Sequence, residues 1–463
     1  MKTQILGISG SIRSNYKKIE LLQNLVNESE SQDELNDKIK IQGITFSNTD
    51  IALAHALLGA KKNGSDIRLI SLTKIFEHKN LSLYENLISY ETVDDIENID
   101  TLDINEKKLL ELLAEVESSE GVILGTPVYF GDRSSVANKL LQLTNKNKLL
   151  KNKAFGVLSV GAKRNGGQET TNIYTLYEAL MQEAVVVGNG PKTAQYGGTV
   201  YAGDLNKAVD DSFGLETSYG VGRQVSQLAK ILKASEAPEK VEKLNITILL
   251  TMDSKDKKYE KLVSDVYSGI DGCNIVVYNL TESNIYRCVA CGVCPSPNLT
   301  EKLAEEALPY NCIVQSPKDS MRTIQEVMSG SDCIIIAGVN SQEDLIYRYQ
   351  AFLERTRFIR RNDFELTNIP IIGLLINELG AINNPLHNVK VLTSFIRHNS
   401  FILKPMQIIF NQEEKVFEDD FESYLTLLQR IKVGRDRVNP LEVSYKATGY
   451  ADKRLDSTVK IRK

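Results

Sequence analysis

Glu120-Gly-Val-Ile-Leu-Gly-Thr-Pro-Val-Tyr-Phe-Gly-Asp132 is the stretch that decides the fold class. The apolar run Gly121 to Gly125 is bounded by turn residues and follows a segment, Asn105 to Glu117, that carries leucines at helical spacing. This pattern is typical of a buried parallel strand after a helix. Two aromatics then follow Pro127, at the carboxyl edge of the predicted sheet, where doubly wound sheets bind ligands. An ordinary strand-to-helix turn is the alternative interpretation.

The composition is that of a soluble globular protein with two domains. The chain has 463 residues, 42% hydrophobic and 25% charged, and single cores rarely exceed roughly 250 residues. We expect domains at 1–235 and 244–435, followed by a tail at 436–463. The net charge of -5 and the scattered lysines argue against nucleic acid as a partner. No apolar stretch approaches the roughly 18 residues of a membrane span, so we expect a cytoplasmic protein without one.

The first strand, Gln4 to Ile8, leads into Ser9-Gly-Ser-Ile-Arg13. Backbone amides, hydroxyl groups and an arginine after a strand are the donors that a phosphate group requires. A second hydroxyl-rich turn, Ser47-Asn-Thr49, precedes a predicted helix that runs to about Lys62. We interpret Ser14 to Phe46 as an insertion that splits one phosphate loop in two. Two unrelated turns are the alternative.

A third loop follows the strand predicted at Ala154 to Val160. Its sequence, from Gly161 to Thr171, combines three glycines, an arginine, amide side chains and hydroxyl groups. Such a loop can approach a flat heterocycle and bond its carbonyl groups and ring nitrogens, although a solvated surface loop would have a similar composition. The acidic segment from Lys74 to Asp103 has no clear periodicity, and a lid or a contact surface are both compatible with it.

The second half of the chain repeats the pattern of the first half. Ser331 to Val339 aligns with Ser119 to Pro127 without a gap, as expected of a duplicated unit. The ligand loops differ, however. The loop Thr251-Met-Asp-Ser-Lys-Asp256 lacks glycine and arginine and places acids where a phosphate would lie. We therefore expect this half to be a degenerate copy without the ligand.

Together, the three loops of the first half resemble those of the NAD(P)H-dependent FMN reductase and multimeric-flavodoxin quinone reductase group. The resemblance implies an α/β fold of two tandem flavodoxin-like, doubly wound, parallel five-stranded sheets with strand order 2-1-3-4-5, and FMN at the carboxyl edge of the first. It implies a phosphate site and two loops that flank the isoalloxazine ring. The residues that it places around the cofactor are Ser9, Ser11, Arg13, Ser47, Asn48, Thr49, Thr126, Pro127, Val128, Tyr129, Phe130, Gly131, Ser159, Val160, Gly161, Arg164, Asn165, Gly166, Gly167 and Gln168.

Two features depart from that family pattern. The insertion interrupts the phosphate loop, and the first half lacks the cysteine-bearing segment that many relatives carry after the second strand. No catalytic side chain follows from the resemblance, because hydride chemistry belongs to the flavin. We expect the four histidines, at 55, 78, 387 and 398, to be surface or packing residues.

Cysteines form a second chemical feature, in the second half of the chain. Cys288, Cys291 and Cys294 have CxxCxxC spacing, and Cys312 could supply a fourth ligand. The motif resembles the compact cysteine motif of iron-sulfur flavoproteins, which implies a [4Fe-4S] cluster. Free thiols and a zinc site are the alternatives.

The leading functional prediction is an oxidoreductase that binds FMN in its first domain and passes electrons from NAD(P)H to a quinone, a flavin or another small acceptor. The alternatives are an electron-transfer flavoprotein, with or without an iron-sulfur cluster, that serves a protein partner, and a non-catalytic assembly protein. We expect a homo-oligomer or a pseudo-dimer of the two domains.

Overall fold

A computed structural model gives the arrangement of the chain. It describes residues 2–77, 80–81, 104–235, 243–290, 312–340, 347–360, 364–381, 384–411, 414–419 and 421–441. Within these residues the protein has an α/β fold built on one mostly parallel sheet of 13 strands. Most of the segment from Lys74 to Asp103 lies outside the described residues.

Six strands of this sheet come from the first half of the chain. They are β1 (Gln4–Ser9), β2 (Asp66–Ser71), β3 (Gly121–Pro127), β4 (Ala154–Gly161), β5 (Val185–Val186) and β6 (Gly198–Tyr201). Their order is β2-β1-β3-β4-β5, all parallel, and β6 pairs with β4 beyond the short β5. The sequence did not predict β6, because its four residues lie in a glycine-containing stretch without clear alternation.

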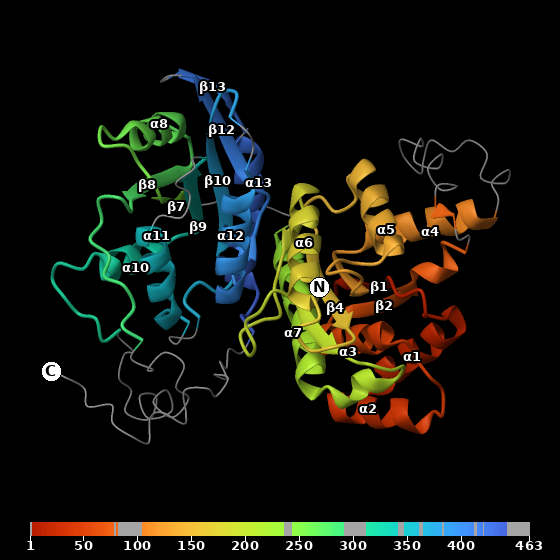
Figure 1. Ribbon diagram of the computed structural model, residues 1–463. Coiled ribbons are helices and arrows are strands. Elements are labelled where there is room, and N and C mark those ends of the chain that lie inside the picture. The colour runs from red at the N-terminus through yellow and green to blue at the C-terminus, as the bar shows by residue number, and fades with distance from the viewer. Residues whose placement is uncertain are drawn as a thin grey trace, which may run out of the picture.

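The helices of the first half cover both faces of these strands (Figure 1). They are α1 (Tyr16–Glu28), α2 (Gln32–Ile41), α3 (Asn48–Lys62), α4 (Ile104–Ser118), α5 (Ser135–Lys146), α6 (Gln168–Met181) and α7 (Ser212–Ala234), with short 3-10 turns η1 (Leu72–Lys74) and η6 (Lys207–Asp210). Helices α3 and α7 approach closely, because a Cβ atom on Gly222 would lie 1.6 Å from the carbonyl oxygen of Ala56.

Helices α1 and α2 lie between β1 and α3 and form the predicted insertion. No helix was predicted at α2, most of which lies in a polar stretch of the chain. This helix has a regular N-cap, since the Ser31 side chain accepts a hydrogen bond from the amide of Glu34. Leu35 and Ile39 are buried, so two apolar residues one turn apart are enough to dock this helix.

The second half contributes the remaining strands and its own helices. The strands are β7 (Leu244–Leu250), β8 (Cys273–Asn279), β9 (Cys333–Val339), β10 (Pro370–Glu378), β11 (Phe401–Ile402), β12 (Met406–Asn411) and β13 (Glu414–Glu418). The helices are α8 (Lys258–Tyr267), α10 (Met321–Ser329), α11 (Tyr347–Arg355), α12 (Leu386–Phe395) and α13 (Glu422–Arg437), with 3-10 turns η7 (Thr356–Phe358) and η8 (Ile396–His398).

The two halves share one sheet, where the sequence predicted two separate sheets. The full order is β2-β1-β3-β4-β5-β11-β10-β9-β7-β8, and the join is an antiparallel pairing of Val186 with Ile402. Around this join α6 contacts α12 and α7 contacts α13, as Figure 1 shows at the centre of the molecule. The sequence did not reveal this join, because β5 and β11 are two residues long and carry no pattern of their own.

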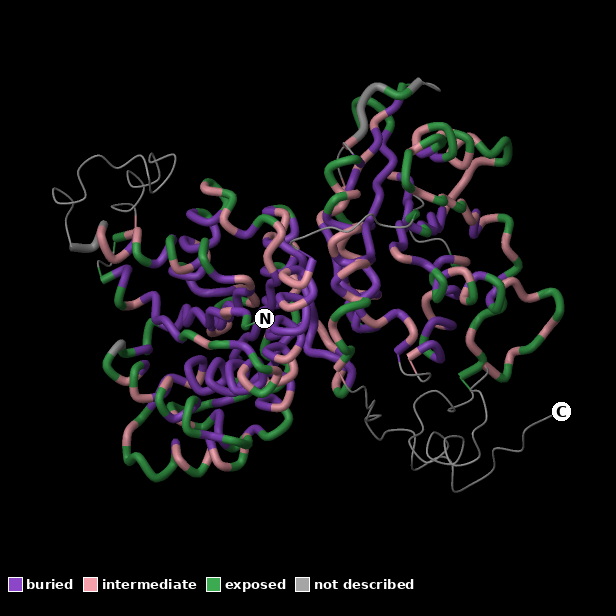
Figure 2. The backbone as a smooth tube through the Cα atoms, turned by 180° about the vertical axis from the view of Figure 1, so that it is seen from behind, coloured by how far each residue is buried: buried purple, intermediate pink, exposed green. Residues whose placement is uncertain are grey.

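Burial follows the sheet through both halves. Figure 2 shows buried backbone running along the central strands and the helices that cover them, with exposed residues at the outer turns. Strand β4 is buried at all eight positions and β9 at all seven, as expected of parallel strands covered on both faces. Among the described residues, no helix is long and apolar enough to cross a membrane.

Candidate functional site

Three loops meet at the carboxyl ends of β1, β3 and β4. The amide of Gly10 donates to the carbonyl of Gly125 at 2.7 Å, and the Ser134 hydroxyl donates to the carbonyl of Gly10 at 2.6 Å. The first loop is therefore held against the second loop and against the start of α5. Gly10 is required by this contact, because a Cβ atom there would lie 2.9 Å from the Cβ atom of Ala137.

The two parts of the predicted phosphate loop lie side by side. The hydroxyl of Ser47 donates to the hydroxyl oxygen of Ser11 at 2.8 Å, although 36 positions separate the two residues. As a result Ser47, the N-cap of α3, makes no side-chain capping bond. The first amides of α3 thus keep their donor capacity at the positive end of a helix dipole, which is a site suited to an anion.

Arg13 supplies the cation that the sequence predicted at this site. Its side chain is exposed, and it makes no hydrogen bond or ion pair with any residue in the described ranges. The backbone amide of Arg13 donates to the Ser11 hydroxyl oxygen at 3.3 Å. The guanidinium group is therefore free to pair with a bound phosphate at the loop.

Asn48 and Thr49 have other roles in the structure. The Asn48 side chain donates to the carbonyl of Asp204 at 2.7 Å and accepts from the amide of Ala208 at 3.1 Å. Thr49 is buried, with its methyl group near Gly125. Both side chains fix the start of α3 in place, so at this site they offer a phosphate their backbone amides.

The second loop presents two aromatic rings to solvent. Tyr129 and Asp132 exchange backbone hydrogen bonds of 2.7 and 3.0 Å, which closes a tight turn over Phe130 and Gly131. Both central residues have positive φ, 53° at Phe130 and 77° at Gly131. Phe130 is fully exposed and Tyr129 is 44% exposed. A bulky residue held exposed in the left-handed region points to a functional role.

The third loop is held in shape by Gln168, a residue that was predicted to contact the cofactor. Gln168 is buried, accepts from the amide of Gly166 at 2.7 Å, and donates to the carbonyl of Lys163 at 2.7 Å. Gln168 therefore shapes the loop and does not project from it. Gly167, with φ of 99°, lies against the second loop, since a Cβ atom there would be 3.0 Å from the Cα atom of Gly131.

Arg164 lies away from the other two loops. Its guanidinium group donates to the carbonyl of Thr199 at 3.1 Å, forms an ion pair with Asp211, and lies over the rings of Tyr201 and Phe213. Residues 162–166 of this loop are exposed, and Asn165 has a φ of 60°. Besides Arg164, the predicted site residues that this loop exposes to a ligand are Asn165 and Gly166.

The other predicted residues lie at the ends of the strands, where they are buried or half-buried and hold the loops in place. Thr126 accepts from the amide of Ser134 at 3.0 Å, and Ser159 donates to the carbonyl of Gln168 at 2.9 Å. Val160 and Gly161 are buried in β4, while Pro127 and Val128 are half-buried below the aromatic turn. The residues predicted for the three loops therefore lie together, some on the surface of the site and others beneath it.

Asp50 was missed by the sequence analysis. It is 1% exposed, and its Oδ1 atom accepts a hydrogen bond of 2.5 Å from the hydroxyl of Ser9, whose oxygen in turn accepts from the amide of Ser11. Burial raises the pKa of its carboxyl group to about 7. The signal in the sequence was an acid in the first turn of a helix that follows a phosphate-loop pattern, which is usually assigned to the helix dipole.

At the corresponding edge of the sheet in the second half, a carboxylate of the protein lies at the start of α8. The Asp253 carboxylate accepts from the amides of Ser254 and Tyr259 at 2.8 and 2.9 Å, and the Ser254 hydroxyl accepts from the amide of Lys258 at 3.0 Å. The first amides of α8 are thus satisfied by side chains of the preceding loop. A phosphate would have to displace the Asp253 carboxylate, whose pKa is raised by burial.

The cysteine motif is described only in part. Cys291 and Cys294 lie outside the described residues, and Cys288 and Cys312 form no disulfide with a described cysteine. Ala290 has φ of 51°, and its amide donates to the Cys288 sulfur at 3.4 Å. In the described part of the chain, no group of three or more His, Cys, Asp and Glu side chains could hold a metal.

Three of the histidines are packing residues, as predicted. His55, His387 and His398 are buried, and burial lowers their pKa values to about 3, 4 and 3. The fourth, His78, lies outside the described residues.

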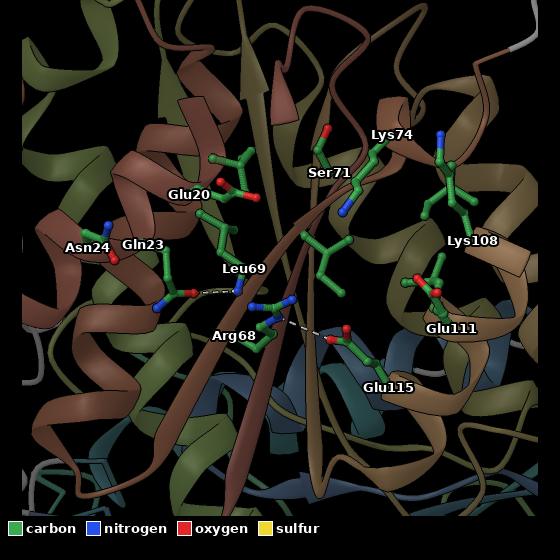
Figure 3. Close-up of a pocket in the computed structure, with 14 residues that line it drawn as sticks. Glu20, Gln23, Asn24, Arg68, Leu69, Ser71, Lys74, Lys108, Glu111 and Glu115 are labelled. Carbon is green, nitrogen blue, oxygen red and sulfur yellow. Dashed lines mark hydrogen bonds and ion pairs between the residues drawn. The ribbon is translucent and has the colours of Figure 1, made fainter. Parts of the chain in front are cut away.

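A recess of about 170 Å³ lies along the outer strand β2, between α1 and α4 (Figure 3). Lysines and an arginine line it together with glutamates, and Arg68 lies 3.4 Å from Glu115. None of its described lining residues belongs to the three loops. The balanced charge makes it less suited to a phosphate than the end of α3.

Parallel strands with three loops at their carboxyl ends define a doubly wound α/β protein with a ligand site at the sheet edge. The family model for NADPH-dependent FMN reductase matches residues 3–191. An iron-sulfur flavoprotein of Methanocaldococcus jannaschii is 33% identical over 205 residues, covering 42% of this chain and 100% of the relative. The chain therefore belongs to the NADPH-dependent FMN reductase family and is an NAD(P)H-dependent flavin oxidoreductase.

Two further comparisons cover shorter or more distant matches. An NAD(P)H dehydrogenase (quinone) of Archaeoglobus fulgidus is 24% identical, over 26% of this chain and 63% of the relative. The solved structure of a flavodoxin, a WrbA-like protein from Agrobacterium tumefaciens, is 15% identical and covers 50% of this chain and 98% of its own, with a TM-score of 0.27. At that TM-score the likeness carries no further conclusion.

Proposed function

We propose that the first half binds one FMN at the three loops and transfers electrons from NAD(P)H to a small acceptor. The observation that carries this proposal is the pairing of Ser11 with Ser47, which leaves the first turn of α3 without a side-chain cap. Nearby in the chain is Arg13, whose guanidinium group has no partner among the described residues. The residues present fit a phosphate group: hydroxyls, open helix amides and the Arg13 guanidinium.

The isoalloxazine ring is assigned to the sheet edge beside the second and third loops. Phe130 and Tyr129 supply exposed aromatic faces on one side, and Asn165 and Gly166 supply polar groups on the other. The turn at Phe130 and the clamp by Gln168 fix both loops before the ligand arrives, which lowers the ordering cost of binding.

The bound flavin would supply the hydride and electron chemistry of the reaction. The protein's part is to hold the phosphate, orient the ring and leave one face open to the co-substrate. As acceptor we propose a quinone or a second flavin, because one relative is named an NAD(P)H dehydrogenase (quinone) and the family is named for FMN reduction.

We further propose that the second half is a degenerate tandem copy that binds no FMN. Its strand order, β8-β7-β9-β10-β11, repeats that of the first half across the β5–β11 join, which is the arrangement of a pseudo-dimer. The Asp253 carboxylate occupies the helix start that corresponds to the open start of α3. Domain boundaries near residues 235 and 244 agree with this proposal.

A second candidate is an electron-transfer flavoprotein with an iron-sulfur cluster. The observation that favours it is the amide of Ala290 directed at the Cys288 sulfur, since such a bond stabilises a thiolate. Cys288, Cys291, Cys294 and Cys312 would hold the cluster, which would supply one-electron transfer to a partner.

The visible spectrum of purified full-length protein tests these proposals. A flavin spectrum that NADH or NADPH bleaches, and that a quinone restores, supports the reductase. A broad absorption near 400 nm with iron and sulfide on analysis of an anaerobic preparation, and no bleaching by either nucleotide, favours the electron-transfer candidate. A colourless protein that does not take up FMN contradicts both.

A further inference from the structure

Asp50 is linked through the Ser9 hydroxyl to the amide of Ser11, in the phosphate site assigned to Ser11 and Ser47. It is the third residue of α3, 1% exposed, and its Oδ1 atom lies 2.5 Å from the Ser9 hydroxyl. A buried carboxylate a few ångströms below a phosphate would repel it, since little water separates the two charges. The family fold alone gives no reason for an acid at this position.

The hydrogen bonds around Asp50 run in one direction. The Ser9 oxygen accepts from the amide of Ser11 at 3.4 Å, and its own proton goes to Asp50. The Ser11 oxygen accepts from the Ser47 hydroxyl and from the amide of Arg13. With Asp50 ionised, the proton of Ser9 is committed to the carboxylate. With Asp50 protonated, the carboxyl can donate to Ser9, whose proton can then turn towards the loop.

We propose that Asp50 is a positioning residue that must carry a proton for tight binding of the FMN phosphate, so that cofactor affinity falls when this carboxyl ionises. The inference rests on the proposed function. Protonation removes the buried negative charge and also reverses the Ser9 hydrogen bond, and both changes favour a bound dianion at the same place.

The surroundings of Asp50 place this titration in the physiological range. Burial raises the pKa of Asp50 to about 7, against the opposing effects of the hydrogen bond from Ser9, the nearby Ser14 hydroxyl and the charge of Lys18 on α1. On other elements packed against α3, Lys207 pairs with Asp210 on η6, Glu216 on α7 pairs with Lys192, and Lys230 on α7 donates to the carbonyl of Asn63. A phosphate brought next to Asp50 would raise its pKa further.

Proton linkage then gives the size of the effect. At pH 6 Asp50 is mostly protonated with or without FMN, so affinity is unaffected. At pH 8 the free protein has lost this proton and must take it up again on binding. The dissociation constant should therefore rise roughly fivefold to tenfold between pH 6 and pH 8.

Flavin fluorescence quenching in the full chain tests the inference without any turnover. FMN is titrated into the wild type and into Asp50→Asn at several pH values from 6 to 8.5, and riboflavin, which lacks the phosphate, is the matched ligand. The ratio of the two proteins' dissociation constants removes the titration of the FMN phosphate itself. We expect this ratio to change fivefold to tenfold for FMN and to stay constant for riboflavin.

Isothermal titration of the wild type in two buffers of different ionisation enthalpy is a second readout, should Asp50→Asn fail to fold. FMN binding at pH 8 should take up close to one proton and riboflavin binding none. A constant ratio for FMN, or no proton uptake, would overturn the role of Asp50 while FMN still binds. Absence of FMN binding at every pH would instead overturn the proposed function, and this inference with it.

Discussion

The hydroxyl oxygens of Ser11 and Ser47 lie 2.8 Å apart, although α1 and α2 separate the two residues in the chain. This contact joins the two pieces of the proposed phosphate loop. It also diverts Ser47 from capping α3, so the amides of the first helical turn are left for an anion. The insertion therefore lengthens the loop in sequence without displacing its two ends.

Arg13→Ala should weaken FMN binding roughly tenfold to a hundredfold, because it removes a charge-assisted bond worth about 1.5–3 kcal/mol. Fluorescence titration measures the change. Lys2→Ala is the control, since Lys2 is also an exposed cation but pairs with Asp66 outside the site. Equal affinities of Arg13→Ala and Lys2→Ala would move the phosphate site away from the first loop.

Two variants of Phe130 separate ring contact from backbone strain. Phe130→Ala and Phe130→Gly both remove the exposed ring, so both should weaken FMN binding or raise the KM of the reduction. Only glycine relieves the positive φ of 53°, so Phe130→Gly should be more stable than Phe130→Ala by about 1 kcal/mol in denaturant unfolding. Unchanged binding and kinetics in both variants would leave the ring without a role.

The order of the three loops was predictable from the sequence, because each is a run of turn residues after an apolar strand. The roles within the loops were not. Gln168 and Asn48 were predicted to contact the ligand. In the structure their side-chain amide groups instead donate to backbone carbonyl groups of the protein. An amide side chain can form hydrogen bonds with a ligand or with the backbone of a loop. Which of the two lies within reach depends on the folded backbone.

The join between the halves was also beyond the sequence. A two-residue strand such as β11 carries no alternation that could be recognised, and the pairing of Val186 with Ile402 depends on contacts more than 200 positions apart, such as Arg397 with Ala194. The sequence showed that Asp253 places an acidic side chain where a phosphate would lie. That it caps the start of α8 could be seen only in the structure.

Asp253→Ser should destabilise the second half by about 1–3 kcal/mol, since amides of Ser254 and Tyr259 and the Asn279 side chain lose a charged acceptor. Denaturant unfolding measures this loss, and Asp271→Ser, at an exposed position, is the control. FMN content should not change. If Asp253→Ser bound a second FMN without losing stability, the Asp253 carboxylate would serve to exclude FMN and not to cap α8.

Asp50→Asn should change the pH dependence of stability in the absence of FMN. In the folded protein the pKa of Asp50 is raised above its unfolded value, so between about pH 4 and pH 7 the folded state binds more protons and wild-type stability falls as pH rises. Above pH 7 the loss is complete. Thermal unfolding from pH 4 to pH 8 should therefore show that the stability of the variant relative to the wild type rises between pH 4 and pH 7. Above pH 7 the difference should stay constant. Parallel curves would show that Asp50 titrates normally.

The amount of flavin bound per chain tests the central claim most directly. The full chain is saturated with FMN, freed of excess by gel filtration and denatured, and the released flavin is measured against protein concentration. One FMN per chain, bleached by NADH or NADPH before denaturation, is the result expected from an open first half and a capped second half. A ratio near two would contradict the asymmetry between the halves, and a ratio near zero would contradict the assignment of the three loops.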